Sequence, residues 1–181
     1  MATSLTIDQA APLGMAIAVT ARDHPDRPAI ISNAGNRSFA ELNTNANRVA
    51  RLLRSAGLQE GSSVALLCTN RPEFVEVIIG VMRCGMRITP INWHLTPGES
   101  AYIVDDCEAH VLFADADCAA AASACLGSSP KLKLGYAIAG ALPGFASYDT
   151  AMAGEDGDDL DDPVIGERML YTSGTTGRPK G

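Results

Sequence analysis

The order of apolar and amphipathic segments restricts the fold of this chain more than any other feature. Residues 64–68 and 110–114 are apolar runs of strand length, and amphipathic segments of helix length lie before, between and after them. Strands that are apolar on both faces occur in parallel sheets, which need helices to cover both faces. The chain is therefore predicted to have an α/β fold of the doubly wound kind, with a mainly parallel sheet and helices on both faces.

Capping signals mark where several helices begin. Ser38-x-x-Glu41 and Thr96-x-x-Glu99 are capping boxes, and the segment after Ser38 places apolar residues at steps of three and four. Gly57 suits the C-terminal cap of that helix. Helices are expected over 12–22, after Ser38, after Arg71, after Thr96 and over 116–125, and strands over 29–31, 64–68, 87–90, 110–114, 131–139 and 167–171.

The composition is that of one globular domain with a local excess of acid. The chain has 181 residues, of which 46% are hydrophobic and 19% charged, and its formal net charge is −7. Most of this excess lies in one short stretch, at Glu155, Asp156, Asp158, Asp159, Asp161 and Asp162. Because no broad basic surface is available to hold phosphates of a duplex, no nucleic-acid partner is expected.

The cysteines and the length of the longest early apolar stretch indicate in which cellular compartment the protein is expected. Five cysteines occur without a C-x-x-C pair, and an odd number among apolar neighbours favours a reduced, cytoplasmic protein. The three histidines are scattered, so a zinc site is not expected. The apolar stretch 10–21 is too short to span a bilayer and no Lys or Arg precedes it, so neither a transmembrane segment nor a secretory signal is expected.

The acidic, glycine-containing stretch 154–163 has no helical or strand periodicity. So many aspartates raise the possibility of a calcium loop, but their spacing fails the D-x-[DN]-x-[DN]-G pattern. We interpret the stretch as a solvated acidic linker.

The segment 172–181 has the chemistry of a polyphosphate site. In ten positions it holds four hydroxyl residues, three glycines and Lys180, directly after the expected strand 167–171. Glycines let backbone N–H groups turn towards phosphate oxygens, hydroxyls donate hydrogen bonds to them, and a lysine adds positive charge. A plain surface turn is the simpler alternative, but it needs neither the preceding strand nor the lysine. The spacing also differs from G-x-x-x-x-G-K-[ST].

Residues 169–180 resemble the signature loop of the adenylate-forming (AMP-binding) enzymes, the superfamily of acyl-coenzyme A synthetases, nonribosomal peptide adenylation domains and luciferases. Upstream segments are similar to the opening region of that family in order and spacing. They are 39–42, 57–61, 70–73, 90–92 and 95–99, and the segment 92–97 is most similar to the fatty-acyl and related acyl-coenzyme A ligase branch.

The resemblance implies a two-step reaction. A carboxylate attacks the α-phosphate of ATP, which carries Mg²⁺, to give an acyl-adenylate, and the thiol of coenzyme A then displaces AMP. In this interpretation the ATP phosphates are bound by Thr172, Ser173, Gly174, Thr175, Thr176, Gly177 and Lys180. No catalytic residue and no protein ligand of the metal is assigned in this chain.

The resemblance also implies that residues 1–181 are the N-terminal portion of an adenylation domain. The adenine-binding segment, the ribose-binding aspartate and the C-terminal domain with its catalytic lysine lie further downstream in the family. We therefore expect a truncated N-terminal fragment that is inactive by itself. The alternative is a non-catalytic remnant or an interaction partner of a full-length homologue, whereas a Rossmann domain would need a G-x-G-x-x-G that is absent.

Several other chemistry-bearing residues have structural interpretations. Trp93 and His94 are interpreted as a packed loop aromatic and a partly exposed imidazole, because no partner for the imidazole is visible. Cys68 and His110 are expected to be structural. Asp115 and Asp117 follow a strand and could meet a ribose, but capping the next helix is the simpler role.

Overall fold

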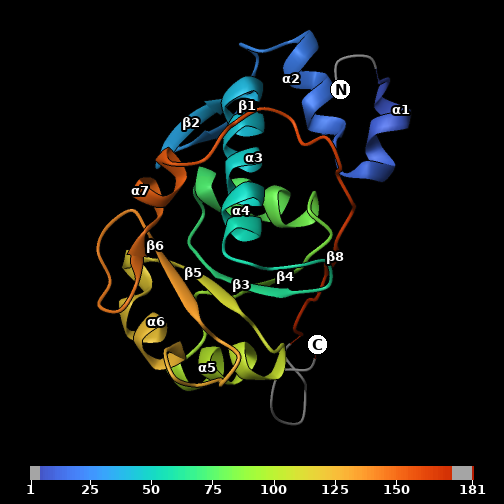
Figure 1. Cartoon of the computed structure of the whole chain (residues 1–181). Coiled ribbons are helices and arrows are strands. Elements are labelled where there is room, and N and C mark those ends of the chain that lie inside the picture. Colours follow the sequence, from blue (N-terminus) through green and yellow to red (C-terminus); the bar gives the residue numbers. More distant parts are fainter. Residues whose placement is uncertain (1–4, 173–180) are drawn as a thin grey trace. The chain divides into compact units, whose positions relative to one another are not determined.

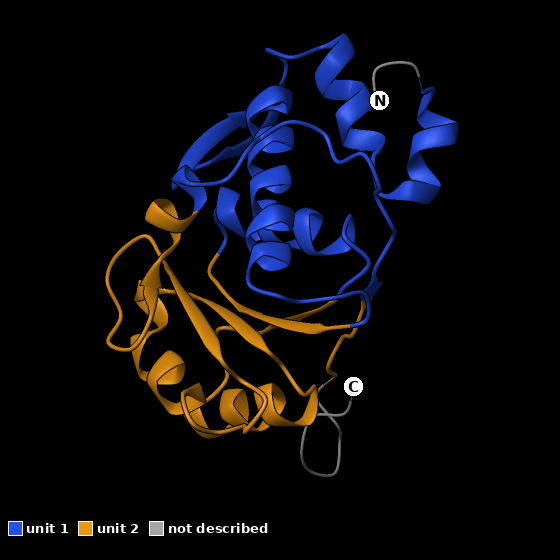
Figure 2. Cartoon of the chain, viewed as in Figure 1, with its two compact units in different colours: residues 1–61, 70–86, 152–167 blue, residues 62–69, 87–151, 168–181 orange. Residues whose placement is uncertain are grey.

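The computed structural model describes residues 5–172 and 181. The chain forms two compact units, coloured blue and orange in Figure 2. Unit 1 comprises Met1–Gly61, Asn70–Met86 and Met152–Glu167, and unit 2 comprises Ser62–Thr69, Arg87–Ala151 and Arg168–Gly181.

Unit 1 is mainly helical, and its α-helices and the strands β1 and β2 are labelled in Figure 1. They are α1 (Ile7–Ala10), the 3-10 helix η2 (Ala11–Leu13), α2 (Ala16–Asp23), β1 (Pro28–Ser32), β2 (Gly35–Ser38), α3 (Phe39–Ser55) and α4 (Pro72–Met82). The strands β1 and β2 pair antiparallel as a hairpin. Helix α3 begins at the predicted capping box, where Ser38 accepts from the backbone N–H of Glu41 and the Glu41 side chain accepts from that of Ser38.

Two local features of unit 1 differ from the sequence expectation. The first helix is interrupted, because Gly14 has a φ of 71°, in the left-handed region, and α2 begins only at Ala16. Strand β2 (Gly35–Ser38), which includes Gly35, is not among the expected strands. In both places a glycine adopts a positive φ, a conformation that the apolar pattern of the neighbouring residues does not predict.

Unit 2 contains the sheet. Its elements are β3 (Ser63–Leu67), β4 (Arg87–Ile91), α5 (Pro97–Asp106), β5 (Val111–Asp115), the 3-10 helix η3 (Ala116–Cys118), α6 (Ala119–Cys125), β6 (Leu134–Ile138) and β7 (Ala146–Ser147). Helix α7 (Tyr148–Ala153) and strand β8 (Glu167–Arg168) lie where the chain passes from one unit to the other. Among the described residues the strand order is β7-β6-β5-β3-β4-β8, and β3 pairs in parallel with both β4 and β5. The expected α/β fold with a mainly parallel sheet is confirmed.

One face of this sheet packs against α5 and α6. Alternate residues of the strands, such as Ala65 and Leu67 in β3, meet Ile103 and Val104 of α5 and Ala122 of α6 in one apolar cluster. This alternation follows from the strand geometry, in which successive side chains point to opposite faces. Strands β3 and β5 are buried along their whole length, as their unbroken apolar sequences predict.

All five cysteines are free and buried, so none forms a disulfide. Burial raises the pKa of the Cys84 and Cys125 thiols to about 12 from an ordinary value of 9. Each folded thiol therefore holds its proton more tightly than the unfolded one. Their contribution to stability is complete below pH 9 and is lost as the pH rises through the range between the two values.

The buried thiols should resist modification until the chain unfolds. At pH 8 we expect Cys84 and Cys125 to react with a thiol-specific reagent at least roughly a hundredfold more slowly in the native chain than in urea, because the thiolate is the reacting form. Peptide mapping by mass spectrometry measures each site, and Cys118, which is 8% exposed, serves as the internal comparison. Equal labelling of Cys84 before and after unfolding would contradict its buried position.

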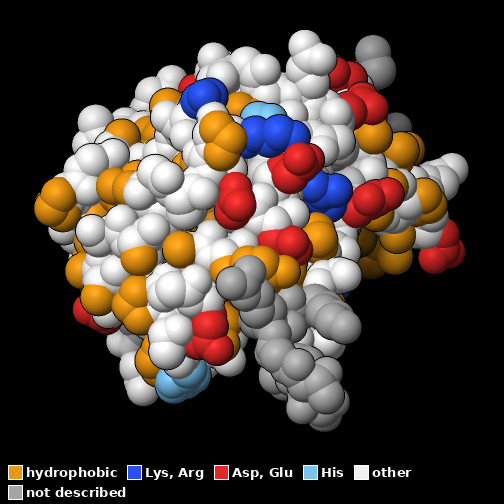
Figure 3. All heavy atoms as spheres, turned by 90° about the horizontal axis from the view of Figure 1, so that it is seen from below, with side chains coloured by type: hydrophobic (Ala, Val, Ile, Leu, Met, Phe, Trp, Pro, Cys, Tyr) orange, Lys and Arg blue, Asp and Glu red, His pale blue; other side chains and the backbone are white. Residues whose placement is uncertain are grey.

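The surface shows mixed charge. On the face drawn in Figure 3, basic side chains are interspersed with acidic ones. Among residues 5–172, no helix combines the length and apolar character needed to cross a bilayer.

Candidate functional site

The predicted phosphate loop is described only at its two ends. Thr172 is exposed, and Gly181 lies at the far end of the motif. The other residues assigned to ATP phosphates lie outside the described residues; they are Ser173, Gly174, Thr175, Thr176, Gly177 and Lys180. The structure therefore describes the segment that leads into the loop, residues 164–171, and the contacts that hold it.

The backbone enters the loop in parallel with β4. In unit 1, Val164 bridges Cys84 in parallel register, and Glu167 N donates to the Met86 carbonyl at 3.1 Å. In unit 2, Met169 N donates to the Ile88 carbonyl at 2.9 Å. The expected strand 167–171 is a strand only over β8 (Glu167–Arg168), and the bond from Met169 to Ile88 continues its path beside β4.

Gly166 allows the close approach at this point. A Cβ added to Gly166 would collide with the carbonyl oxygen of Met86, and the Gly166 N–H itself donates to the Met82 carbonyl at 2.6 Å. No other residue type can pass so near a neighbouring backbone without a shift.

The base of the loop is held by side chains of unit 2. The Tyr171 hydroxyl donates to Oδ2 of Asp106 at 2.5 Å, and the Tyr102 hydroxyl donates to Oδ1 of the same carboxylate at 3.1 Å. Burial, followed by the hydrogen bond to Asp106, raises the pKa of Tyr171, so this phenol stays protonated and remains a donor. Tyr102, Met169 and Tyr171 all pack against the apolar cluster of unit 2.

The ends of β3 and β5 share a buried carboxylate. Asp115 is fully buried, its Oδ1 accepts from Asp117 N at 3.0 Å, and its Oδ2 accepts from the Thr69 hydroxyl at 2.5 Å. The expected capping role of Asp115 is confirmed, because it is the N-cap of η3. The Cys68 thiol donates to the same oxygen at 3.9 Å and is buried, as the sequence predicts.

Trp93 and His94 follow the end of β4 in an exposed loop. Their ring centroids lie 3.6 Å apart, and Trp93 is 41% exposed. The indole therefore contacts the neighbouring imidazole, and it is more exposed than a packed loop aromatic would be. His110 is half-buried directly before β5, and its Nδ1 has no hydrogen-bond partner among the described residues.

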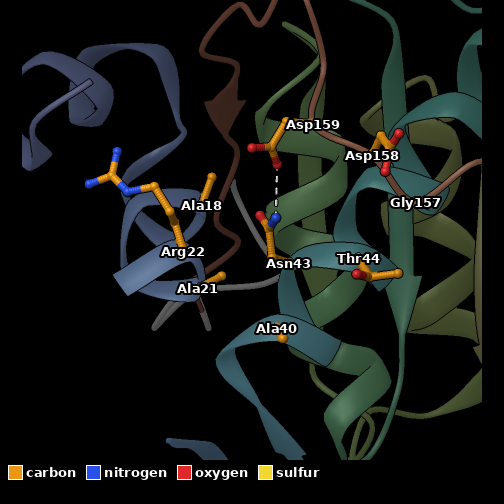
Figure 4. A pocket seen from close by; sticks show the side chains of 9 residues that line it. All are labelled: Ala18, Ala21, Arg22, Ala40, Asn43, Thr44, Gly157, Asp158 and Asp159. Atoms are coloured by element: carbon orange, nitrogen blue, oxygen red, sulfur yellow. Dashed lines mark hydrogen bonds between the residues drawn. The ribbon is translucent and has the colours of Figure 1, made fainter. Parts of the chain in front are cut away.

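Unit 1 contains an open pocket of about 270 Å³, shown in Figure 4. It is lined by Ala18, Ala21, Arg22, Ala40, Asn43, Thr44, Gly157, Asp158 and Asp159. Helices α2 and α3 supply one part of its wall and the acidic stretch supplies the other. Asn43 Nδ2 donates to Asp159 Oδ1 at 2.8 Å across this pocket.

A buried arginine lies behind the pocket wall. The Arg83 side chain is fully buried, and its Nη1 donates to Oδ1 of both Asn43 and Asn47, at 3.0 and 2.5 Å. Burial lowers the pKa of Arg83 to about 10, although the nearby Asp159 carboxylate favours the charged form. Asn47 also donates to the Gly157 carbonyl and to Asp159, which ties the helix to the acidic stretch.

The acidic stretch, interpreted from sequence as a solvated linker, is attached along α3. Arg48, Arg51 and Arg54 donate to its backbone carbonyls, and Arg54 also pairs with Asp162 at 2.7 Å. The three arginines are spaced by three, so they lie along one side of the helix. Within the described residues no group of three or more His, Cys, Asp or Glu side chains is placed to hold a metal ion.

Sequence reasoning missed the Tyr171–Asp106 pair and the Arg83–Asn47–Asp159 network. The asparagines did carry a signal, because Asn43 and Asn47 are spaced by four on a helix beside its apolar stripe. No local pattern connects Asp106 with Tyr171, which are 65 positions apart.

Comparison with known proteins identifies AMP-binding enzymes and acid ligases as similar to this chain. A family model described as AMP-binding enzyme matches residues 17–181. A fatty acid–[acyl-carrier-protein] ligase, ScoC of Streptomyces coeruleorubidus, is 29% identical over 162 residues, covering 89% of this chain and 30% of the relative. The sulfoacetate–CoA ligase of Cupriavidus necator is 30% identical over 174 residues, covering 93% of this chain and 34% of the relative. The chain thus spans about a third of the length of these relatives.

Solved structures agree on the fold. The anthranilate CoA ligase AuaEII in complex with anthranoyl-AMP matches with a TM-score of 0.85 at 24% identity, over 93% of this chain and 33% of that one. The inhibitor-bound N-terminal domain of FACL13 from Mycobacterium tuberculosis matches with a TM-score of 0.78 at 26% identity, over 94% of this chain and 43% of that one. These matches cover the N-terminal part of such domains.

Proposed function

The chain belongs to the AMP-binding enzyme family, and on that premise we propose that residues 172–181 bind the phosphates of ATP in an acid–thiol ligase. The observation that carries this proposal is the course of the chain into the loop. Met169 is hydrogen-bonded beside β4 and Tyr171 is held by Asp106, so the segment that leads into Thr172 is supported. A backbone segment that presents several N–H donors to one ligand must be held in place where it begins.

The proposed chemistry is activation of a carboxylic acid. Its carboxylate attacks the α-phosphate of ATP and pyrophosphate leaves, giving an acyl-adenylate, after which the coenzyme A thiol displaces AMP and forms a thioester. The difficulty of the first step is the repulsion between two anions, which donors and cations around the phosphates reduce. Mg²⁺ bound with ATP would neutralise part of the phosphate charge. Hydroxyls and N–H groups of 172–177 would bind phosphate oxygens, and Lys180 would add positive charge.

The proposed substrate is a fatty or related acyl acid, in the reaction of the whole enzyme. Support comes from the relatives, which include ligases named for fatty acids and others named for sulfoacetate and 3-hydroxybenzoate. The proposed compartment is the cytoplasm. Five free, buried thiols support a reducing environment.

Polyphosphate binding by the 181-residue chain tests the proposal. We expect inorganic tripolyphosphate and Mg-ATP to bind saturably in isothermal titration calorimetry. Lys180→Ala should weaken binding roughly tenfold, since it removes a charge-assisted contact. Lys131→Ala is the matched control, because Lys131 is paired with Glu108 at 2.7 Å, and it should change affinity less than about twofold. Absence of saturable binding, or equal binding by Lys180→Ala, would refute the proposed role of the loop.

A further inference from the structure

The Asp106 carboxylate connects helix α5 to the residue that precedes the loop. Asp106 is the last residue of α5, and its two oxygens accept from two different tyrosine hydroxyls. Tyr102 lies one helical turn earlier on α5, so its bond is local. Tyr171 comes from a distant part of the chain, so its bond fixes one segment to another.

Tyr171 also contacts the far end of the motif. A Cβ added to Gly181 would lie 2.8 Å from Cζ of Tyr171 and 2.6 Å from Cε of Met169. Gly181 therefore lies close to the Tyr171 ring and the Met169 methyl group, and an added Cβ would require one of these side chains to shift. One phenol ring thus touches Gly181 while its own backbone continues into Thr172.

Two successive hydrogen bonds fix the backbone position of the segment that precedes Thr172. The first is the backbone bond from Met169 to Ile88, and the second is the side-chain bond from Tyr171 to Asp106. A phenylalanine at position 171 could pack its ring in the same place, but it has no hydroxyl to donate to the Asp106 carboxylate. Because a site that is ordered in advance loses less entropy when the ligand binds, such anchoring favours affinity.

We propose that Tyr171 is a positioning residue for the phosphate loop, held by Asp106 through its hydroxyl. This inference rests on the proposed function of residues 172–181. In this inference Asp106 favours phosphate binding, although its negative charge alone would oppose it. A carboxylate near an anion site weakens anion binding through repulsion, whereas a carboxylate that orders the site strengthens it.

Substitutions in the 181-residue chain separate the two roles. Tyr171→Phe keeps the ring and removes the hydroxyl, and Asp106→Ala removes the acceptor. Each should weaken tripolyphosphate binding about fivefold to tenfold, which is within the range that the loss of one hydrogen bond usually produces. Tyr102→Phe is the matched control, since it removes the other hydroxyl on the same carboxylate, and it should change affinity less than about twofold. Tighter binding by Asp106→Ala would overturn the inference in favour of simple repulsion.

Cleavage by chymotrypsin provides a readout that does not need a ligand. The enzyme cuts after Tyr or Phe, so cleavage after residue 171 reports how firmly this segment is held. Rates are divided by those of the same chains in urea, and unchanged thermal midpoints confirm that the variants are folded. Tyr171→Phe and Asp106→Ala should be cleaved several-fold faster than wild type and Tyr102→Phe. Equal rates would overturn the inference.

The two readouts distinguish the inference from the proposed function. If the wild-type chain binds no tripolyphosphate, the proposed function fails, and the cleavage rates alone then decide whether Tyr171 is anchored by Asp106. If wild type binds and Tyr171→Phe binds equally well, the proposed function stands and the positioning role of Tyr171 is refuted.

Discussion

Replacing Asn47 with alanine is expected to destabilise the folded chain by about 3 kcal/mol. The Asn47 side chain is fully buried, accepts from Arg83, and donates to the Gly157 carbonyl and to Asp159. Its removal leaves a buried guanidinium short of an acceptor, while Nε and Nη2 of Arg83 already have no partner among the described residues. Because an uncompensated buried charge is costly, the effect exceeds that of an ordinary lost hydrogen bond.

Urea unfolding followed by circular dichroism measures this loss as a lower midpoint. Arg54→Ala is the matched control. It also cuts a bond between α3 and the acidic stretch, but its partner Asp162 is 77% exposed. An exposed pair is screened by water, so this variant should lose less than about 1 kcal/mol. If the two variants lost equal stability, the buried network would not be what holds the acidic stretch.

Gly80→Ala should destabilise the chain by about 2–3 kcal/mol, although alanine is the better helix former. Gly80 is buried in α4 where it meets α3. An added Cβ would lie 2.5 Å from Cβ of Val49 and 2.7 Å from the Ala46 carbonyl oxygen. Contacts this short involve backbone and a buried branched side chain, so the two helices would have to separate.

Gly98→Ala is the control for this second prediction. Gly98 lies in the first turn of α5, and an added Cβ would meet nothing within 4 Å. The helix propensity of alanine then acts alone, so stability should be unchanged or rise by up to about 1 kcal/mol. Thermal unfolding of both variants is the measurement. A neutral Gly80→Ala would show that α3 and α4 pack less closely than described.

The local elements follow from local chemistry. Ser38 and Thr96 each cap a helix as their spacing with Glu41 and Glu99 predicts, because a capping box satisfies N–H groups within one turn. The apolar runs became β3 and β5 within one residue of their expected bounds. Such signals are carried by neighbouring residues, so they can be recognised without knowing the fold.

The α/β class, the helix starts, the buried strands and the resemblance of the final segment to a phosphate-binding motif can all be recognised from the amino-acid sequence. The bonds from Arg83 to Asn47 and from Tyr171 to Asp106 become visible only in the folded chain. Hydrogen bonds and ion pairs between distant residues depend on which segments the folded backbone brings together. A surface arginine and a buried one look alike in a sequence, and what distinguishes Arg83 from Arg54 is the water that folding removes from around it.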